Sequence, residues 1–380
     1  MIYFDNNATT QIAPQVFDAM QPYLTASFGN PSAAYSFGED SRKVVDAARE
    51  SVAGLVGAAS AAEITFTSCG TESDNWAILG ALEATGKNHI IATKVEHDAI
   101  RKLCEREEKR GRRVTWLDVD ESGALDIGGL RTALDAETAV VSIMLANNET
   151  GILFPVEEIG KIVKEHSDAL FHVDGVNAAG KVPVNLKGTE IDLFSISGHK
   201  FHGPKGIGAL YIREGVALPS FFIGGGQESG KRAGTEAVHQ IAGLGAAAQF
   251  ASDLSPMTKI QAMRDWLETE ILRQIPNSHL NGVSDTTKRL PNTSNISFAN
   301  TNGEMILARL DDFGVYVSTG SACNSQNHTA SPVLAAMNVP YSHAMGSIRF
   351  SLGRFNSESE VDVVLSAVPQ IVRELREITG

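Results

Sequence analysis

The segment that decides the fold is SISGHKFHGPKG, residues 195–206, which lies between two apolar runs. The run 191–196 before it and the run 207–212 after it have the length and composition of buried strands. A lysine between two core strands needs an explanation, because burying an ammonium group is costly unless the group is paired, neutralised or consumed chemically. Lys200 is therefore either bonded to a cofactor carbonyl as a Schiff base or a strand-end lysine that reaches water.

A second strand end carries an acid. In the stretch FHVDG, residues 171–175, Asp174 closes another apolar run. An acid at this point can keep a pyridine nitrogen protonated, which is the partner that a lysine-bound pyridoxal phosphate requires. Asp174 and Lys200 together therefore favour the cofactor interpretation of the lysine.

Patterns typical of strands and helices alternate along most of the chain. We expect strands at 63–67, 89–93, 113–117, 139–145, 292–298, 315–318 and 347–355, and helices at 14–23, 41–55, 98–110, 126–134, 156–165, 240–251, 255–275, 304–312 and 358–378. The alternation predicts an α/β fold with a mainly parallel sheet, whose sites lie at the carboxyl ends of the strands. We predict an N-terminal segment at 1–13, a large domain at 14–254 and a smaller α+β domain at 255–380.

The turn after the first of these strands is suited to an anion. Residues 68–71, SCGT, come between a strand and a helix, where free backbone N–H groups and the helix dipole attract negative charge. The following TESD, residues 71–74, has the spacing of a capping box. A phosphate at Gly70 and Thr71 fits the cofactor that Lys200 and Asp174 suggest.

Composition limits the binding partners and the cellular compartment that we expect. The chain has 380 residues and a formal net charge of −13, which argues against nucleic acid or an anionic membrane as a partner. No apolar run has the length of a membrane span, and the N-terminus does not resemble a signal peptide. Three scattered cysteines suggest free thiols, so we expect a cytoplasmic protein. The ten histidines and these cysteines do not form a ligand cluster, and no metal site is predicted.

The motif SGHK at 197–200, followed by GPKG at 203–206 and preceded by Asp174, resembles the cysteine desulfurases of the class V aminotransferase family. The resemblance covers nearly the whole chain. It implies the fold of a fold-type I pyridoxal 5′-phosphate enzyme, with a large cofactor domain and a small C-terminal domain.

The resemblance also implies roles for individual residues. His97, in a Glu-His pair after a strand, would stack on the cofactor ring and shuttle protons, beside Lys200 as the base. The residues expected to bind the cofactor are Gly70, Thr71, His97, Asn148, Asp174, Asn177, Ser197, His199, Lys200 and Thr235. Asn7 and Asn148 would line the substrate space. Arg354, in the stretch RFSLGR, would hold a substrate carboxylate bidentately.

One cysteine lies in a matching motif. TGSAC, residues 319–323, is set among small and polar residues, so the thiol of Cys323 should be accessible and usable as a thiolate nucleophile. The resemblance makes Cys323 the sulfur acceptor of a desulfurase. Three positions depart from the family pattern: Tyr35 replaces a histidine, Asn177 a glutamine and Ser229 an arginine.

These observations predict a cysteine desulfurase that converts L-cysteine to L-alanine and places the sulfur on Cys323 as a persulfide. Through Thr235 the resemblance implies a homodimer with shared active sites, and it implies an iron–sulfur scaffold protein as sulfur acceptor. A selenocysteine lyase or an aminotransferase on the same scaffold, or a sulfur carrier without catalysis, remains an alternative.

Overall fold

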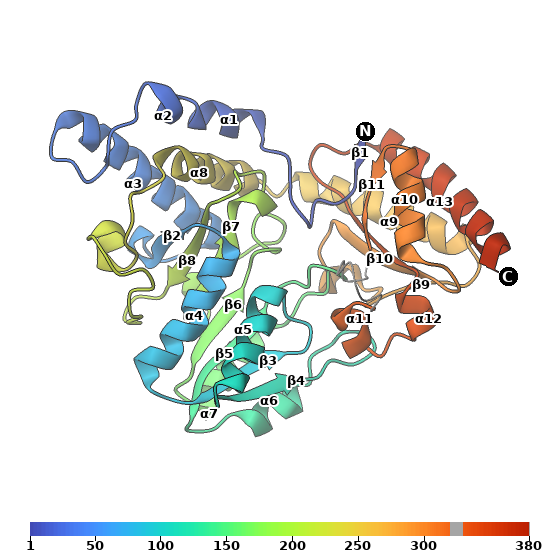
Figure 1. The fold of residues 1–380 in the computed structure, drawn as a ribbon, viewed down its shortest axis with the longest axis horizontal. Coiled ribbons are helices and arrows are strands. Elements are labelled where there is room, and N and C mark those ends of the chain that lie inside the picture. The colour runs from blue at the N-terminus through green and yellow to red at the C-terminus, as the bar shows by residue number, and fades with distance from the viewer. Residues whose placement is uncertain (320–329, 380) are drawn as a thin grey trace.

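The computed structural model describes residues 1–319 and 330–379, and it places them in two lobes (Figure 1). The larger lobe is built on a seven-stranded sheet in the order β2-β8-β7-β6-β5-β3-β4. Its strands are β2 (Ile64–Thr67), β3 (His89–Thr93), β4 (Arg113–Leu117), β5 (Thr138–Met144), β6 (Leu170–Asp174), β7 (Leu193–Ser197) and β8 (Gly208–Ile212). Among these strands only β8 runs in the direction opposite to the other six. The predicted α/β fold with a mainly parallel sheet is thus confirmed.

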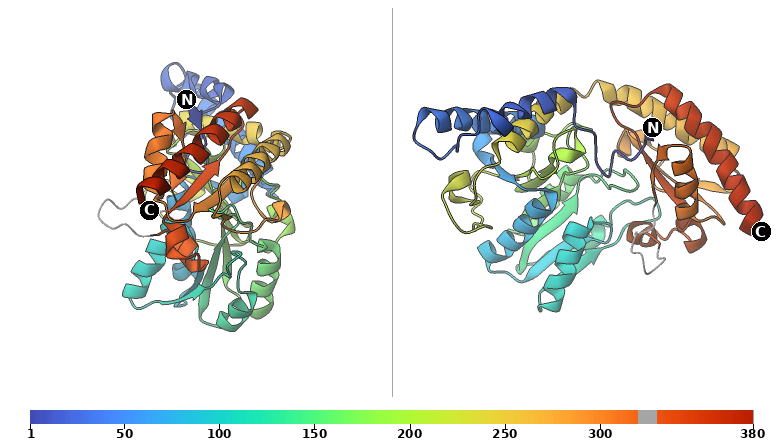
Figure 2. Two further views of the ribbon diagram at one scale, coloured as in Figure 1. Left: turned by 90° about the vertical axis from the view of Figure 1, so that its right-hand side faces the viewer. Right: turned by 45° about the horizontal axis from the view of Figure 1, so that its top comes forward.

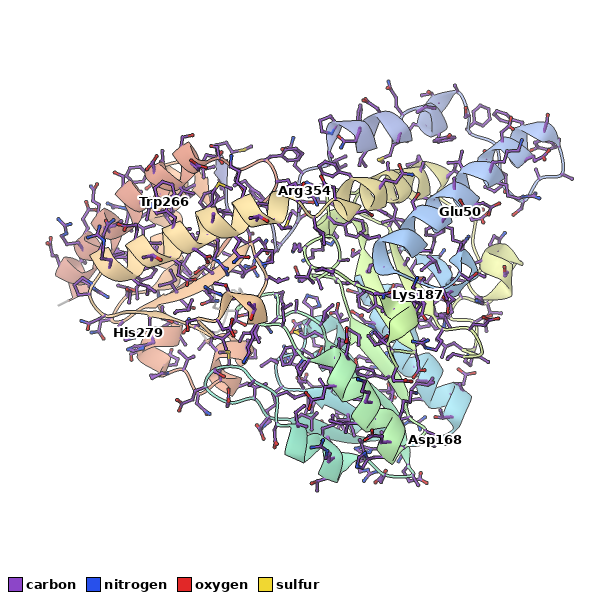
Figure 3. The ribbon with its side chains drawn as sticks, turned by 180° about the vertical axis from the view of Figure 1, so that it is seen from behind. Glu50, Asp168, Lys187, Trp266, His279 and Arg354 are labelled. Atoms are coloured by element: carbon purple, nitrogen blue, oxygen red, sulfur yellow. The ribbon has the colours of Figure 1, made fainter. Side chains whose placement is uncertain are left out.

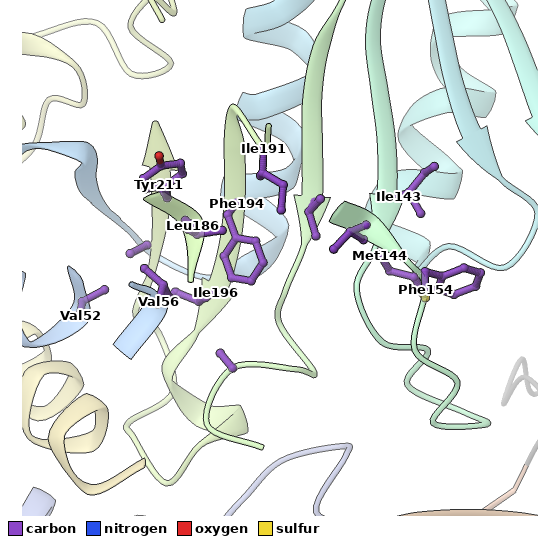
Figure 4. Close-up of a cluster of buried hydrophobic side chains, with 14 of the residues drawn as sticks. Val52, Val56, Ile143, Met144, Phe154, Leu186, Ile191, Phe194, Ile196 and Tyr211 are labelled. Atoms are coloured by element: carbon purple, nitrogen blue, oxygen red, sulfur yellow. The ribbon is translucent and has the colours of Figure 1, made fainter. Parts of the chain in front are cut away.

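Helices cover both faces of this sheet, as its buried, β-branched strands require. One face packs on α4 (Gly70–Thr85) and α5 (Asp98–Lys109). The other face packs on α3 (Ser36–Val56), α6 (Ile127–Ala133), α7 (Val156–His166) and α8 (Val238–Ser252). Figure 4 shows part of this second core, where Val52 and Val56 of α3 lie near Phe194 and Ile196 of β7. The short helices α1 (Pro14–Met20) and α2 (Pro22–Thr25) lie on α8.

The smaller lobe has a four-stranded antiparallel sheet in the order β12-β13-β10-β9. These strands are β9 (Ser278–Leu280), β10 (Thr293–Phe298), β12 (Ser318–Thr319) and β13 (Ser347–Ser351). The helices α9 (Pro256–Gln274), α10 (Gly303–Asp312) and α13 (Glu358–Thr379) cover it, and α9 and α13 run side by side along its outside (Figure 2). Two further short helices, α11 (Pro332–Ala336) and α12 (Tyr341–Ala344), lie at its edge.

The first residues of the chain join the smaller lobe. Strand β1 (Ile2–Tyr3) pairs in parallel with β11 (Val315–Tyr316), and Ile2 and Phe4 are part of the apolar core of that lobe. The two lobes thus have largely separate apolar cores, with the chain crossing between them near residues 5–13 and 253–255, although Val333 and Met337 at α11 pack into the core of the large lobe. This separation supports the predicted domain boundaries, which remain a prediction.

Some expected elements differ in detail. The helix expected at 14–23 divides at Gln21, because Pro22 has no N–H to continue the ladder and begins α2 instead. The strand expected at 315–318 divides into β11 and β12, which pair with β1 and β13. The sequence analysis did not predict the short elements β1, β9, α11 and α12. None of the helices in the described part of the chain is long and apolar enough to cross a membrane.

The predicted capping box at 71–74 is wrong. Helix α4 already begins at Gly70, so Thr71 lies inside it, and Cys69 is the cap residue without a side-chain hydrogen bond. Glu72 instead satisfies the preceding turn, because its carboxylate accepts the backbone N–H of Ser68 at 2.7 Å. The other oxygen of Glu72 accepts from Arg232 at 2.9 Å, and this ion pair fixes the turn against the glycine-rich loop at residues 222–235.

Candidate active site

Asp174 and Lys200 come together because their strands are neighbours in the sheet. Asp174 ends β6, and Lys200 ends the single 3₁₀ turn Gly198–Lys200 that follows β7. The two strands pair in parallel, with Asp174 opposite Ser195. After β6 the chain passes close to β7 at Gly175, where a Cβ atom would lie 1.9 Å from the ring of Phe194. Glycine is therefore required at this point if the acid is to reach the site.

Lys200 rests on the N-terminal segment. Its Nζ donates a hydrogen bond to the backbone carbonyl of Asn7. Burial and the nearby guanidinium of Arg349 lower the pKa of Lys200 to about 8, although the charges of Asp174 and Asp5 act in the opposite direction. A lysine with this pKa is partly an uncharged amine near neutral pH, and can act as a nucleophile or a base.

Beneath the site lies a layer of buried acids. Burial raises the pKa of Asp174, and the hydrogen bond from the backbone N–H of Val176 and the charge of Lys200 oppose the rise. Burial and the charge of Asp174 raise the pKa of Asp74 well above its ordinary value, and burial raises that of Glu96 to about 8. A cation placed at Asp174 would lower the pKa of its carboxyl group and hold it ionised. A protonated pyridine nitrogen is such a cation.

The turn before α4 has the features of a phosphate site. A Cβ on Gly70 would lie 2.7 Å from Val176 Cγ2 and 3.5 Å from Ser197 Cβ, so the helix start packs directly on the ends of β6 and β7. Ser197 is buried, and its Oγ has no hydrogen-bond partner among the described residues. An unpaired buried hydroxyl beside the N-terminus of a sixteen-residue helix fits an anionic ligand. Pyridoxal phosphate therefore fits the residues present.

The buried residues Asp74, Glu96 and Ser197 form what we call the floor of the site. Two histidines lie beside this floor. His97 is the cap residue of α5, and its Nδ1 accepts the backbone N–H of Ala99 at 3.2 Å, which leaves the proton of the neutral ring on Nε2. His199 hydrogen-bonds through Nδ1 to the hydroxyl of Thr9 at 3.2 Å. Burial and the neighbouring lysines lower the pKa of His199 to about 4, so this ring is neutral in the folded protein. Only His97 of the pair is exposed.

The side of the site opposite this floor, which we call the wall, is built around Asn7. Its Nδ2 donates to Thr293 Oγ1 at 2.8 Å and to the carbonyl of Asn148 at 3.1 Å. Its Oδ1 accepts from Lys181 and from Asn292, both at 3.1 Å. The side chain of Asn7 is therefore fully occupied with protein partners, and the residue contacts the site through its backbone carbonyl. Its predicted contact with the substrate stays a prediction.

Two arginines of the stretch RFSLGR take different positions. Arg354 donates through Nη2 to the carbonyls of Ala251 and Asp253 at 3.2 and 2.7 Å, and its guanidinium lies over the ring of Phe250 at 4.8 Å. Figure 3 shows Arg354 at the junction between α8 and α9. Arg354 and Lys200 line the same small cavity of about 20 Å³, so the predicted carboxylate contact would need Arg354 to leave these carbonyls.

Arg349 lies beside Asn148 and near Lys200. It donates through Nη1 to the carbonyl of Asn148 at 3.0 Å and forms an ion pair with Asp5 at 2.6 Å. Its Nε is buried without a partner among the described residues, and its charge lowers the pKa of Lys200. The sequence analysis missed this residue. The signal was available, because Arg349 lies inside the alternating strand and points to the face opposite its neighbours.

The other predicted residues are placed as follows. Asn177 is buried in the turn after β6, Asn148 is half-buried after β5, and Thr71 is exposed on the first turn of α4. Thr235 is exposed and lines a hollow of about 80 Å³ with Ser68 and Arg232. Cys323 lies outside the described residues. The remaining cysteines are Cys69, half-buried at the phosphate turn, and Cys104, whose pKa burial raises to about 12.

Comparison with known proteins identifies the family of this chain. The sequence profile described as aminotransferase class-V matches residues 2–364, and the chain belongs to this family. Members of the family use pyridoxal 5′-phosphate, so the predicted cofactor is confirmed.

Within this family, the chain is similar to individual proteins that are named cysteine desulfurases. The chain is 50% identical over 384 residues to the cysteine desulfurase of Trichormus azollae, a match that covers all of this chain and 94% of the relative. It is 45% identical over 381 residues to the cysteine desulfurase NifS of Azotobacter vinelandii, with the same coverage. A solved NifS-like protein superposes with a TM-score of 0.92 at 38% identity, covering 98% of this chain and all of that one.

Proposed function

We propose that this protein is a cysteine desulfurase, which converts L-cysteine to L-alanine and moves the sulfur to Cys323. The observation that carries the proposal is the placement of Asp174, Lys200 and the unpaired Ser197 hydroxyl on adjacent strand ends, in a chain about half identical to cysteine desulfurases. A solved relative, SspA in complex with cysteine, is 33% identical with a TM-score of 0.82 over 94% of this chain.

Pyridoxal phosphate, when bound, withdraws electrons from the α-carbon of an amino acid and so weakens the bonds at that carbon. Asp174 would hold the proton of the ring nitrogen, and Asn148 and Asn177 would face the ring oxygen. Gly70, Thr71, Ser197 and His199 would hold the phosphate, with Thr235 from a second copy of the chain. His97 would lie against the ring.

Lys200 is the base of the proposed reaction. Its pKa of about 8 leaves an uncharged amine that can take the Cα proton of the substrate and return a proton to the product. His97, with its proton on Nε2, would assist the later proton movements. The N-terminal segment stabilises the turn that carries Lys200, because Thr10 Oγ1 donates to His199 O at 2.9 Å and accepts from His202 N at 2.7 Å.

We infer that Arg349 receives the substrate carboxylate, in place of the predicted Arg354. Arg349 is beside Asn148 and close enough to Lys200 to change its pKa, and its Nε has a free buried proton to donate. An incoming carboxylate would compete with Asp5 for this guanidinium, a geometry that favours bidentate binding. Arg354 instead stabilises the C-terminal end of α8.

The sulfur transfer balances without an external oxidant. The carbon–sulfur bond of L-cysteine breaks and a sulfur–sulfur bond forms at the thiolate of Cys323. The β-carbon takes up the electron pair and a proton and leaves as the methyl group of L-alanine. Exposure of the thiolate is the condition for this use of a cysteine. An acceptor such as an iron–sulfur scaffold protein would then take the sulfur from the persulfide.

We further propose that the protein is a cytoplasmic homodimer. Large apolar side chains stay exposed around the glycine-rich loop and the N-terminal helices, among them Ile223 at 96% and Phe28 at 72% exposure. Exposed apolar groups of this size mark an interface. The exposed Thr235 lies in the same region of the chain. A second copy of the chain that covers these residues would therefore receive Thr235 at that second copy's cofactor site.

The test is a paired measurement of alanine and sulfide from purified protein given L-cysteine and a thiol reductant. We expect equal yields from the wild type, no sulfide from Cys323→Ser with the cofactor still bound, and wild-type yields from Cys104→Ala, whose thiol is buried. Normal sulfide release by Cys323→Ser would contradict the role of that thiol. Stoichiometric 3-mercaptopyruvate, the keto acid that transamination of cysteine gives, would identify an aminotransferase instead, and selenide formation that excludes cysteine would identify a selenocysteine lyase. A protein that forms neither product while carrying sulfur would be a non-catalytic carrier.

A further inference from the structure

A third cationic residue lies beside the site without a role in the proposed reaction. Lys181 follows Asn177 by four residues, in the turn after β6, and is only 7% exposed. No acidic side chain in the described part of the chain pairs with it. A buried lysine without a counter-ion is costly as an ammonium group, so its presence calls for an explanation.

The contacts of Lys181 connect two amides of the site. Its Nζ donates to Asn7 Oδ1 at 3.1 Å and to Asn177 Oδ1 at 3.4 Å. Burial and the charges of Lys200 and Arg349 lower the pKa of Lys181 well below its ordinary value. An uncharged amine has two N–H groups, and the structure provides one acceptor for each. The group is thus satisfied as a neutral donor.

This arrangement fixes which end of the Asn177 amide faces the cofactor space. Because the oxygen accepts from Lys181, the nitrogen must point away from it. No residue in the described ranges accepts a hydrogen bond from Asn177 Nδ2. Without Lys181, the amide could turn over and present its oxygen, which would repel the ring oxygen of the cofactor instead of donating to it.

A second effect acts through Asn7. Lys181 and Asn292 together hold Asn7 Oδ1, and the backbone carbonyl of the same residue receives the Nζ of Lys200. The two lysines therefore rest on one asparagine, one on its side chain and the other on its main chain. A displacement of Asn7 would change the position of Lys200.

We propose that Lys181 is a positioning residue that orients the Asn177 amide with its nitrogen toward the cofactor ring oxygen and anchors the asparagine on which Lys200 rests. This inference rests on the proposed place of Asn177 beside the cofactor, and it does not require the protein to act on cysteine. It also gives a reason why the shorter asparagine can serve where the family commonly has glutamine, because the side chain is held in one orientation.

The experiment follows the visible absorbance of the bound cofactor against pH, with no substrate present. In Lys181→Met we expect the midpoint of the titration to rise by about one pH unit, the size expected when one hydrogen bond to a charged group is lost. The direction is upward because a ring oxygen that loses a donor holds the neighbouring proton more tightly. Asn177→Ala should show the same shift. The control is Lys161→Met, an exposed lysine on α7, whose midpoint should equal that of the wild type.

The double variant Lys181→Met/Asn177→Ala tests whether Lys181 acts through Asn177. If Lys181 acts mainly through Asn177, the double variant shifts by clearly less than the sum of the two single shifts, and any excess over Asn177→Ala alone measures the effect through Asn7. Additive shifts, an unchanged midpoint in Lys181→Met or an unchanged midpoint in Asn177→Ala would overturn the proposal. If Lys181→Met does not fold, Lys181→Ala, which also removes the donor, takes its place in the same cycle and is judged by the same outcomes. Because no cysteine is added, failure of this proposal is distinct from failure of the proposed desulfurase activity.

Discussion

The floor and the wall of the site treat their buried polar groups in opposite ways. On the floor, among the described residues, Ser197 Oγ, Asp74 Oδ1 and Glu96 Oε2 have no hydrogen-bond partner. On the wall, every polar atom of the Asn7 side chain is paired with a protein group. Unpaired buried groups are costly, whereas paired ones stabilise a unique arrangement. The unpaired groups of the floor are therefore suited to bind a ligand, whereas the paired groups of the wall stabilise the arrangement of the wall itself.

Arg349 is the exception that connects the two regions. It is held in the wall by Asn148 and Asp5, yet its Nε is buried without a partner in the described part of the chain. By the same reasoning, this one atom of the wall is prepared for a ligand. The comparison thus separates the residues proposed to contact the cofactor, the residue proposed to contact the substrate and the residues that hold these side chains in place.

The largest effect is expected at Lys200. Lys200→Ala should lower the rate of alanine formation by on the order of a thousandfold or more, because both the base and the covalent anchor of the cofactor are lost. The measurement is initial rates together with the visible spectrum of the bound cofactor. Lys205→Ala, an exposed lysine five residues later, is the matched control. A Lys200→Ala protein with an unchanged spectrum would remove the basis of the site.

The next effect separates the two arginines. Arg349→Gln should raise the KM for L-cysteine by about 100-fold, the effect of losing a charge-assisted contact to a carboxylate. Arg354→Gln should raise it by less than about threefold, because that side chain caps backbone carbonyls and its loss resembles that of an ordinary hydrogen bond. Steady-state kinetics of both variants measure the difference. The reverse order would return the carboxylate to Arg354.

A smaller pair of effects tests the floor against the wall directly. Asn7→Ala should lower the free energy of unfolding of the apoprotein by about 2–4 kcal/mol, because several buried partners lose their hydrogen bonds at once. Ser197→Ala should leave that free energy nearly unchanged and weaken cofactor binding by about tenfold. Denaturant unfolding and cofactor titration measure the two quantities. If Ser197→Ala destabilises the apoprotein as much as Asn7→Ala, the comparison fails.

The smallest effect concerns pH. The pKa of Lys200 in the apoprotein is lowered to about 8, so half of the amine is uncharged near that pH and the uncharged fraction levels off about one pH unit above it. The rate of cofactor incorporation should therefore rise by about threefold between roughly pH 7.5 and 8.5, and by little above pH 9. Stopped-flow absorbance of apoprotein mixed with pyridoxal phosphate measures it. A rate that falls over this range would show that another group controls incorporation.

Much of the fold could be predicted because it depends on local patterns. The strands at 89–93 and 113–117 match the structure at both ends, since their apolar runs stop at clear turn residues. Asp174 and Lys200 were identifiable for the same reason, as charged residues that directly follow apolar strands. The short strand β9 has no such pattern, because two of its three residues are polar and its pairing with β10 decides its structure.

The rest of the site depends on contacts between distant segments. The hydrogen bonds of Asn7 reach residues 148, 181, 292, 293 and 200, and no pattern within residues 1–13 indicates them. The choice between Arg349 and Arg354 likewise depends on which carbonyls lie nearby in space. No pattern around Lys181 indicates burial, and only the structure shows this lysine to be buried. Cys323 remains a prediction from its motif.

The pairing of the N-terminal segment with the far end of the chain has a consequence for biosynthesis. Asn6 and Asn7 bond to Ser351, and Ile2 pairs with Val315, so these contacts have a very long sequence separation. At about 5–20 residues per second, the roughly 100 residues between the end of α8 and β13 take about 5–20 s to translate. During that interval the emerging large lobe contains Lys200 and Asn7, but Asn7 still lacks its partners Asn292, Thr293 and Ser351. Such a nascent chain is a candidate client for chaperones, and stable capture of the cofactor should follow release from the ribosome.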